Sequence, residues 1–254
     1  MSDRNNELAG KVTIVTGSAR NIGRAIALEL ARGGAALTIN AVSDKDAAEA
    51  VAQEVRDLGA KAFVCMADIS KQEDVDRIVG DTVKEFGGLD ILVNNAAARS
   101  TRKFTELKFE DWEKVRKIAC DGGLRMCIAA APHLIERGSG SIVGIHGMGA
   151  YSGAPNGAHK SAVKEAMSAY LRGIAVDLGE YDINVNTAVV GSFETDRASG
   201  SGETISQTKD AKIPMKRRGQ PQDMANLVRF LVGPYGHYIS GQTIHVNGAA
   251  LMPH

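Results

Sequence analysis

Two lysines one helical turn apart are the residues of this chain best suited to acid–base chemistry. Lys160 and Lys164 lie in the alanine-rich segment 156–167, NGAHKSAVKEAM, whose pattern predicts a helix. Residues four apart share a helix face, and like charges there repel slightly. Such a pair could lie on a solvated helix face, or it could belong to an active site whose usual residues have been replaced. The elements around the segment favour the active site.

Composition restricts the class of protein. The chain has 254 residues, of which 44% are hydrophobic and 24% charged, and this suits one large α/β domain with a sizeable core. The formal net charge is zero, so charge gives no argument for nucleic acid or an anionic membrane as partner. Cys65, Cys120 and Cys127 show neither metal-ligand nor disulfide spacing, and we expect no metal. The polar N-terminal segment and the lack of an apolar run of about 18 residues predict a cytoplasmic protein.

Strand and helix patterns alternate along the whole chain, which predicts a parallel sheet covered on both faces in a single domain, 1–254. We expect the long helix 109–138 to bend at Gly122 and Gly123. Segment 191–215, which contains SGSGE, is the expected substrate lid. The predicted strands are 11–17, 36–41, 61–70, 90–97, 140–147, 183–190 and 243–248.

A glycine-rich turn joins the first predicted strand to the first predicted helix. It reads TGSARNIG and contains Gly17, Asn21, Ile22 and Gly23. Such a turn exposes backbone N–H groups at a helix N-terminus, where a pyrophosphate binds. The position of the turn between strand and helix makes this interpretation stronger than a glycine pattern alone would.

Five motifs, in this order, resemble those of the short-chain dehydrogenases/reductases, and the resemblance covers nearly the whole chain. The motifs are TGSARNIG, ADIS with Asp68, NNAA at 94–97, INVNTAVVGSFET and ISGQTIHVNGA. The resemblance implies a single-domain Rossmann fold, a doubly wound parallel sheet of about seven strands. It also implies a nicotinamide dinucleotide cofactor, a small-molecule substrate, and a homotetramer or homodimer formed through two long helices.

The resemblance also implies which residues hold the cofactor. Ala41 stands where NAD-dependent members place an aspartate, and Arg20 lies in the loop where NADP-dependent members carry a basic residue. Asn40 and Ser43 could donate to a 2′-phosphate, so NADP(H) is favoured over NAD(H), although Arg20 could instead be a solvated loop charge. The implied cofactor-binding residues are Gly17, Arg20, Asn21, Ile22, Gly23, Asn40, Ser43, Asp68, Ile69, Asn94, Ala96, Lys164, Gly191 and Thr195.

The family's tetrad of Asn, Ser, Tyr and Lys is substituted at three positions. Asn186 follows Lys164 at the family's usual distance, which implies that Lys164 is the ribose-binding lysine. Lys160 then takes the Tyr position, and Gly147, thirteen residues earlier, takes the Ser position. Ala119 takes the Asn position.

Several groups could act in place of the missing tetrad residues. Lys160 could donate a proton, could pair with an acidic substrate, or could be inert. His146 could donate a hydrogen bond to substrate or be structural, and Tyr151 could supply a phenol. For His159 we expect a packing or interface role. The sequence therefore predicts an NAD(P)-dependent oxidoreductase for a small carbonyl, imine or conjugated substrate, with an atypical proton donor. The alternative is a catalytically silent dinucleotide-binding regulatory or scaffold protein.

Overall fold

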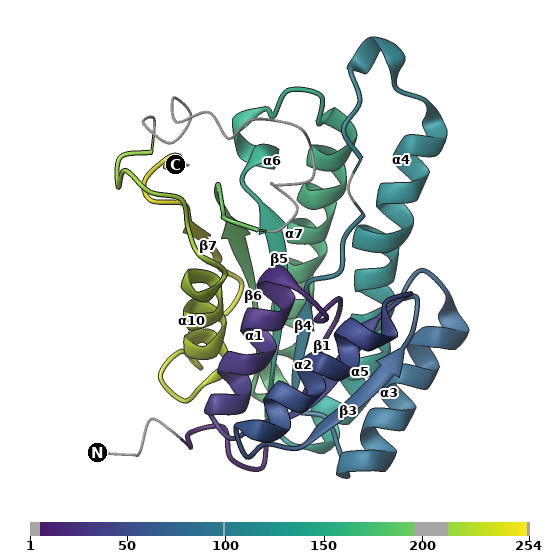
Figure 1. The fold of residues 1–254 in the computed structure, drawn as a ribbon, viewed down its shortest axis with the longest axis vertical. Coiled ribbons are helices and arrows are strands. Elements are labelled where there is room, and N and C mark those ends of the chain that lie inside the picture. Colours follow the sequence, from purple (N-terminus) through teal and green to yellow (C-terminus); the bar gives the residue numbers. More distant parts are fainter. Residues whose placement is uncertain (1–5, 99, 196–212, 253–254) are drawn as a thin grey trace.

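Seven parallel strands form one sheet in the order β3-β2-β1-β4-β5-β6-β7 (Figure 1). The structure is a computed structural model that describes residues 6–98, 100–195 and 213–252. The single sheet and its parallel pairing confirm the predicted fold class. The strands are β1 Val12–Val15, β2 Ala36–Ala41, β3 Ala62–Met66, β4 Ile91–Asn94, β5 Gly140–Gly147, β6 Ile183–Val190 and β7 Thr243–Val246.

Helices cover both faces of the sheet, and each face has its own apolar core (Figure 1). One core packs three helices against the sheet: α1 Asn21–Arg32, α2 Lys45–Asp57 and α10 Pro221–Val232. The other packs α3 Gln72–Phe86, α5 Gly123–Glu136 and α7 Ala158–Leu178. The central strands β1, β4, β5 and β6 are almost entirely buried, whereas β3 and β7, at the edges of the sheet, are mostly half-buried.

The predicted helix 109–138 is interrupted in the middle. α4 Phe109–Arg116 passes into a π-helical turn, η2 Lys117–Gly122, before α5 begins. A Cβ on Gly122 would lie 2.8 Å from the Ile69 carbonyl oxygen, and one on Gly123 would lie 2.6 Å from Tyr170 Oη. The two glycines therefore allow close approach of neighbouring groups at a π turn, a feature often found at functional sites.

The run from α4 to α5 is the one helical stretch of the described chain that is long and apolar enough to cross a membrane, judged by length and composition alone. Within α5, Met126, Cys127 and Leu134 pack into the second core, as expected for a helix that covers a sheet. All three cysteines of the chain are free thiols.

Two short helical turns were not predicted, η1 Phe104–Glu106 and η3 Gly179–Tyr181, and neither was the short helix α6 Gly149–Ser152, which precedes α7. Of the expected lid, residues 196–212 lie outside the described residues. Phe193, before that gap, forms a β-bridge with Gly219, after it.

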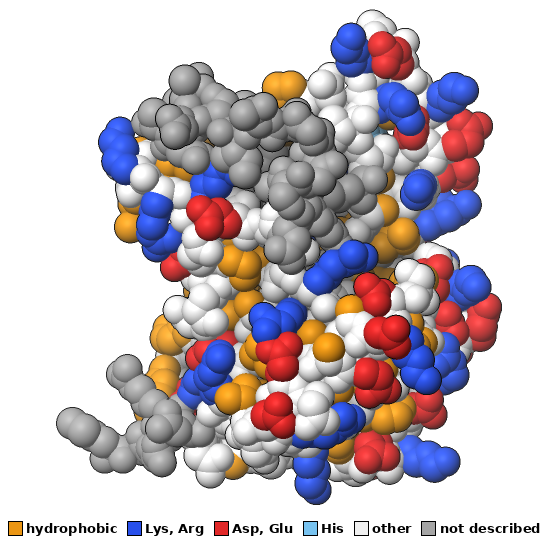
Figure 2. Space-filling view, in the orientation of Figure 1, with side chains coloured by type: hydrophobic (Ala, Val, Ile, Leu, Met, Phe, Trp, Pro, Cys, Tyr) orange, Lys and Arg blue, Asp and Glu red, His pale blue; other side chains and the backbone are white. Residues whose placement is uncertain are grey.

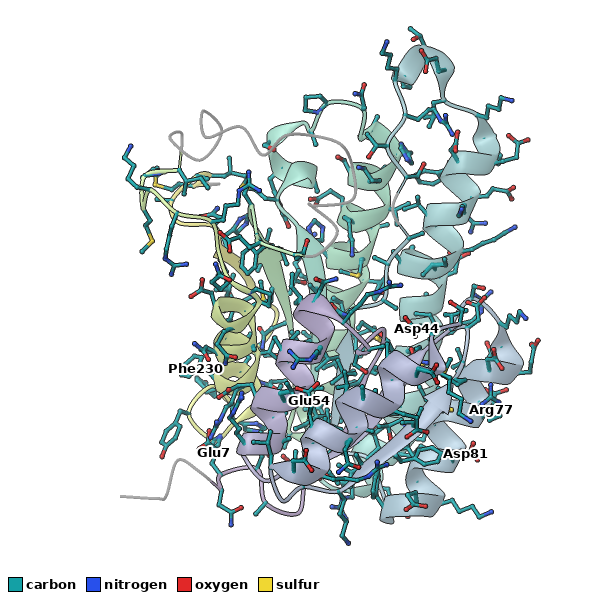
Figure 3. All side chains as sticks on the ribbon, viewed as in Figure 1. Glu7, Asp44, Glu54, Arg77, Asp81 and Phe230 are labelled. Carbon is teal, nitrogen blue, oxygen red and sulfur yellow. The ribbon has the colours of Figure 1, made fainter. Side chains whose placement is uncertain are left out.

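Ion pairs fasten the N-terminal segment to the helices. Arg229 of α10 donates to Glu7 at 2.9 Å and to Glu29 of α1 at 2.7 Å, and Arg24 pairs with Glu54 of α2. Figure 3 shows Glu7 beside the lower end of α10 and Glu54 between α1 and α2. On the face shown in Figure 2, acidic and basic side chains are interspersed, as the zero net charge suggests.

Candidate active site

The turn between β1 and α1 is tight: two of its residues have positive φ angles, and a third, a glycine, allows close approach of the backbone. Gly17 and Asn21 have positive φ angles of 63° and 51°, which confirms that asparagine can stand in for a glycine there. A Cβ on Gly23 would lie 2.4 Å from the Gly17 carbonyl oxygen and 2.6 Å from Asn95 Nδ2. Any larger residue at 23 would open the turn.

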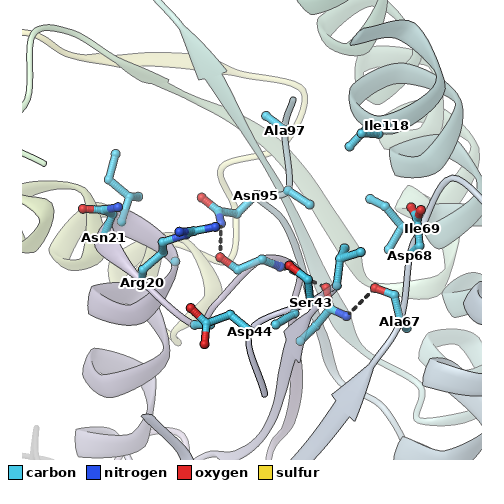
Figure 4. Close-up of a pocket in the computed structure, with 18 of the residues that line it drawn as sticks. Arg20, Asn21, Ser43, Asp44, Ala67, Asp68, Ile69, Asn95, Ala97 and Ile118 are labelled. Atoms are coloured by element: carbon cyan, nitrogen blue, oxygen red, sulfur yellow. Dashed lines mark hydrogen bonds between the residues drawn. The ribbon is translucent and has the colours of Figure 1, made fainter. Parts of the chain in front are cut away.

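A cavity of about 290 Å³ lies in front of this turn, at the carboxyl edge of the sheet (Figure 4). No side chain caps the N-terminus of α1, and the first turn of α1 carries no acidic residue. The backbone amides and the positive end of the helix dipole therefore favour a bound anion. The cavity has the chemistry of a phosphate site at one end and apolar walls from Ile69 and Ile118 at the other.

Most residues expected to hold a cofactor line this cavity. They are Gly17, Arg20, Asn21, Ile22, Gly23, Asn40, Ser43, Asp68, Ile69, Ala96 and Thr195. Sequence reasoning missed Asn95 and Asp44, which the motifs NNAA and NAVSDKD could have indicated, and Ile118, which only the π turn brings to the cavity. Figure 4 shows Arg20 and Asn21 on one side of the cavity and Asp68 and Ile69 on the other.

Asn40 differs from the expectation that its side chain donates to a phosphate. Its Nδ2 donates to the carbonyls of Cys65 at 3.1 Å and Ala67 at 3.0 Å, so both amide hydrogens are used. Its Oδ1 accepts from the Gly17 N–H at 3.0 Å. The side chain is buried and ties the glycine turn to β3, and it has no donor left for a ligand.

Asn94 and Gly191 also serve the framework. Asn94 Nδ2 donates to the Gly123 carbonyl at 3.0 Å and contacts Cys127 Sγ at 3.2 Å, so this side chain is directed at α5 and does not line the cavity. Gly191 donates its N–H to Val246, and a Cβ there would lie 2.7 Å from Asn247 Cα. Glycine at 191 lets the chain leave β6 against the end of β7.

The two lysines have different surroundings. Lys164 Nζ donates to the Ile145 carbonyl of β5 at 2.7 Å, and burial lowers the pKa of this amine to about 8. Lys160, one turn nearer the start of α7, donates to Thr101 Oγ1 at 3.1 Å in an exposed setting. Neither lysine is among the residues that line the cavity: Lys164 is enclosed between α7 and β5, and Lys160 is more exposed, one turn nearer the start of α7.

The positions aligned with the Ser and Asn of the tetrad carry no polar side chain and have opposite environments. Nothing lies within 4 Å of a Cβ built on Gly147, so that position borders open space. Ala119 in the π turn is buried in a small apolar cluster with Val115 and Val163. A side chain would have room at position 147, whereas position 119 is enclosed by apolar neighbours.

Tyr151 lies in a row of rings on the α7 side of the sheet. Its ring centroid is 5.3 Å from that of His146 and 4.9 Å from that of His245. Its hydroxyl lies 3.5 Å from Ser168 Oγ, one turn beyond Lys164 along α7. The phenol thus packs between α6, α7 and β7. His159 is buried, 3% exposed, as expected for a packing role.

The chain resembles known enzymes over almost all of its length. Residues 17–249 match the family model described as Enoyl-(Acyl carrier protein) reductase. The chain is 32% identical to the 3-oxoacyl-(acyl-carrier-protein) reductase FabG of Staphylococcus epidermidis over 242 residues, which cover 95% of this chain and 99% of the relative. It is 33% identical to the FabG of Aquifex aeolicus over 243 residues, covering 95% and 98%.

Solved structures agree with this result. A short chain dehydrogenase from Burkholderia cenocepacia in complex with NADP superposes with a TM-score of 0.90 at 33% identity, covering 96% of this chain and 99% of that one. A 7α-hydroxysteroid dehydrogenase complexed with NADH and 7-oxo glycochenodeoxycholic acid gives a TM-score of 0.92 at 31% identity, covering 98% of each chain. The shared fold, the glycine turn and these identities lead to one conclusion: the chain is an oxidoreductase of the short-chain dehydrogenase/reductase family.

Proposed function

We propose that the protein transfers a hydride between NADP(H) and a small carbonyl, imine or conjugated substrate, with Lys160 as the proton donor. The observation that carries the proposal is the pair of lysines on one helix, one buried against β5 and one exposed a turn earlier, together with the open space at Gly147. A bound nicotinamide dinucleotide would supply the hydride.

The residues of the cavity fit such a cofactor. Gly17 and Gly23 leave the room that a pyrophosphate needs in front of α1, and Asp68 and Ile69 lie where an adenine would sit. NADP(H) is favoured over NAD(H) because β2 ends in Ala41 and Arg20 borders the same cavity as Ser43. Asp44, which follows Ser43 in the cavity wall, caps α2: its carboxylate accepts from the Ala47 N–H at 3.1 Å. This hydrogen bond holds the Asp44 carboxylate at the start of α2.

Each lysine has one role in this proposal. Lys164 would hold the nicotinamide ribose, as the resemblance implies, with its amine held in place by the Ile145 carbonyl of β5. Lys160 gives its proton to the substrate oxygen or nitrogen and recovers it from solvent, since its amine is in an exposed setting. Because Lys160 reaches solvent itself, the reaction does not need a proton relay through position 119, which is apolar.

The substitutions at Gly147, Ala119 and Lys160 favour a second candidate, a protein that binds the dinucleotide without turnover. A general acid contributes about 10²–10⁴-fold to a rate. Without one, simple ketones would react slowly, whereas activated imines or enones would tolerate the loss of the general acid.

One experiment separates the two candidates. NADPH oxidation is followed with a panel of ketones, imines and enones, using the wild-type chain and Lys160→Met, which keeps the length of the side chain. Turnover of at least one class, reduced about 100-fold by Lys160→Met with NADPH affinity unchanged, supports the proposal. NADPH binding without turnover of any class supports the silent protein. Turnover of simple ketones unaffected by Lys160→Met would show that the proton donor is another group.

The remaining properties follow from the family. We propose a cytoplasmic homotetramer or homodimer that acts on a small molecule, with neither nucleic acid nor membrane as partner. Zero net charge and the mixed surface in Figure 2 support the last point.

A further inference from the structure

Two asparagines of the chain are each followed by glycine, and the fold holds their side chains differently. Asn156–Gly157 and Asn247–Gly248 are both continued by alanine, so the two asparagines have the same residues after them. In an Asn–Gly sequence the main-chain nitrogen of the glycine can attack the side-chain amide carbon, because glycine has no side chain to hinder the approach. Which asparagine reacts in the folded protein depends on how freely its side chain rotates.

Asn247 is held at both atoms of its side-chain amide. Its Nδ2 donates to the Leu251 carbonyl at 2.6 Å, and its Oδ1 accepts from the Ala249 N–H at 3.0 Å. The residue is also half-buried, at the end of β7. Its side chain has to give up these hydrogen bonds to turn toward the Gly248 nitrogen, so the fold protects this asparagine.

Asn156 has no such restraint on its side chain. It is exposed in the loop between α6 and α7, and its side chain makes no hydrogen bond to any described residue. Its φ angle of 58° is one that asparagine tolerates. Two hydrogen bonds hold the main chain: the Arg102 N–H donates to the Asn156 carbonyl at 3.1 Å, and the Gly157 N–H donates to the Ala154 carbonyl at 3.2 Å. Of these two, only the second, at the long end of the usual range, opposes attack by the Gly157 nitrogen.

On these contacts we propose that Asn156 is a site of spontaneous deamidation. The Gly157 nitrogen gives up its proton and bonds to Asn156 Cγ, the bond from Cγ to Nδ2 breaks, and Nδ2 leaves as ammonia. The product is a cyclic succinimide. Water then opens the ring by adding hydroxyl to one of the two carbonyl carbons and hydrogen to the nitrogen, which leaves aspartate or isoaspartate at position 156. Water is the one co-reactant, and no electrons are transferred.

The product adds a carboxylate at the start of α7. The first turn of α7 has no acidic residue, and its N-cap, Gly157, provides no side-chain hydrogen bond, so a negative charge is favourable there. A Cβ on Gly157 would lie 3.4 Å from Lys160 Cε, so the Lys160 side chain runs beside this loop. Deamidation of Asn156 therefore changes the charge close to Lys160.

Peptide mapping by mass spectrometry, after incubation of the whole chain at mildly alkaline pH, follows the conversion of both asparagines in one sample. In the folded protein we expect Asn156 to convert at least about tenfold faster than Asn247. In concentrated urea the two rates should become similar, because the hydrogen bonds of Asn247 are lost and both asparagines precede Gly-Ala. This comparison needs no substitution, so it does not depend on the folding of a variant.

Ion-exchange chromatography gives a second readout with matched variants. The main acidic form that accumulates in the wild type should also accumulate in Asn247→Gln and should be lost in Asn156→Gln, because glutamine would have to close a larger ring. Equal conversion of the two asparagines in the folded protein, or faster conversion of Asn247, would overturn the inference. So would an acidic form that accumulates equally in Asn156→Gln. The reaction uses neither NADPH nor substrate, so its outcome is independent of the proposed function.

Discussion

Lys160 and Lys164 occupy successive turns of α7, and their contacts predict different effects of substitution. Lys164→Ala removes a charged hydrogen-bond donor enclosed against β5, so we expect NADPH affinity to fall about 10- to 100-fold, equivalent to roughly 1.5–3 kcal/mol. Lys160→Ala removes an exposed group that does not line the cavity and should change that affinity by less than about threefold. Cofactor fluorescence measures both. Equal losses in the two variants would show that Lys160 is the ribose-binding residue.

The protonation of Lys164 adds a pH dependence. Burial lowers the pKa of the Lys164 amine to about 8, so in the free protein this cation is lost as pH rises through that value. NADPH affinity should therefore decrease above about pH 8. Lys164→Arg keeps its charge throughout and should flatten the profile between pH 7 and about pH 9.5. The same decline in the arginine variant would assign the pH dependence to another group.

At the scale of elements, regular strands and helices were predictable and side-chain direction was not. β2, β5 and β6 have the predicted bounds, because short, largely β-branched and apolar segments between helical patterns are typical of strands in a parallel sheet. The motif around Asn94 correctly indicated the edge where the site lies. Whether Asn40 and Asn94 face a ligand or the framework depends on neighbouring strands and helices. The π turn at 117–122 lies where Gly122 and Gly123 allow close approach of Ile69 and Tyr170, which are distant in sequence.

The role of Asn40 gives a test at this scale. Its three hydrogen bonds join the glycine turn to β2 and β3, so Asn40→Ala should lower the free energy of unfolding by about 2–3 kcal/mol. Ser43→Ala, in the same cavity wall, should change it by less than about 0.5 kcal/mol. Urea denaturation followed by circular dichroism measures both. An unchanged stability of Asn40→Ala would contradict the structural role assigned here.

At the scale of the whole molecule, buried histidines make the fold sensitive to acid. Burial lowers the pKa of His146 to about 4 and also lowers that of His245, while both would titrate near their ordinary value of 6.5 in the unfolded chain. Between these values the unfolded state binds more protons, so stability should fall as pH falls from about 6.5 to about 4. His146→Gln should make this fall shallower in urea titrations at several pH values. An identical slope would mean that His146 is protonated in the folded protein.

The oligomeric state is a further property of the whole molecule, and sedimentation measures it. Ile128 of α5 and Val176 of α7 are 65% and 81% exposed, although both helices also contribute residues to the core. Exposed apolar residues on these two helices fit the association through two long helices that the family resemblance implies. Sedimentation equilibrium should therefore give two or four times the chain mass of 26.9 kDa. Ile128→Glu or Val176→Glu should shift the mass toward that of one chain, because an unpaired carboxylate buried in an interface is unfavourable. Val42→Glu is the control: Val42 is exposed in the wall of the cavity, and its substitution should leave the mass unchanged. A wild-type mass of one chain would mean that these helix faces are solvated.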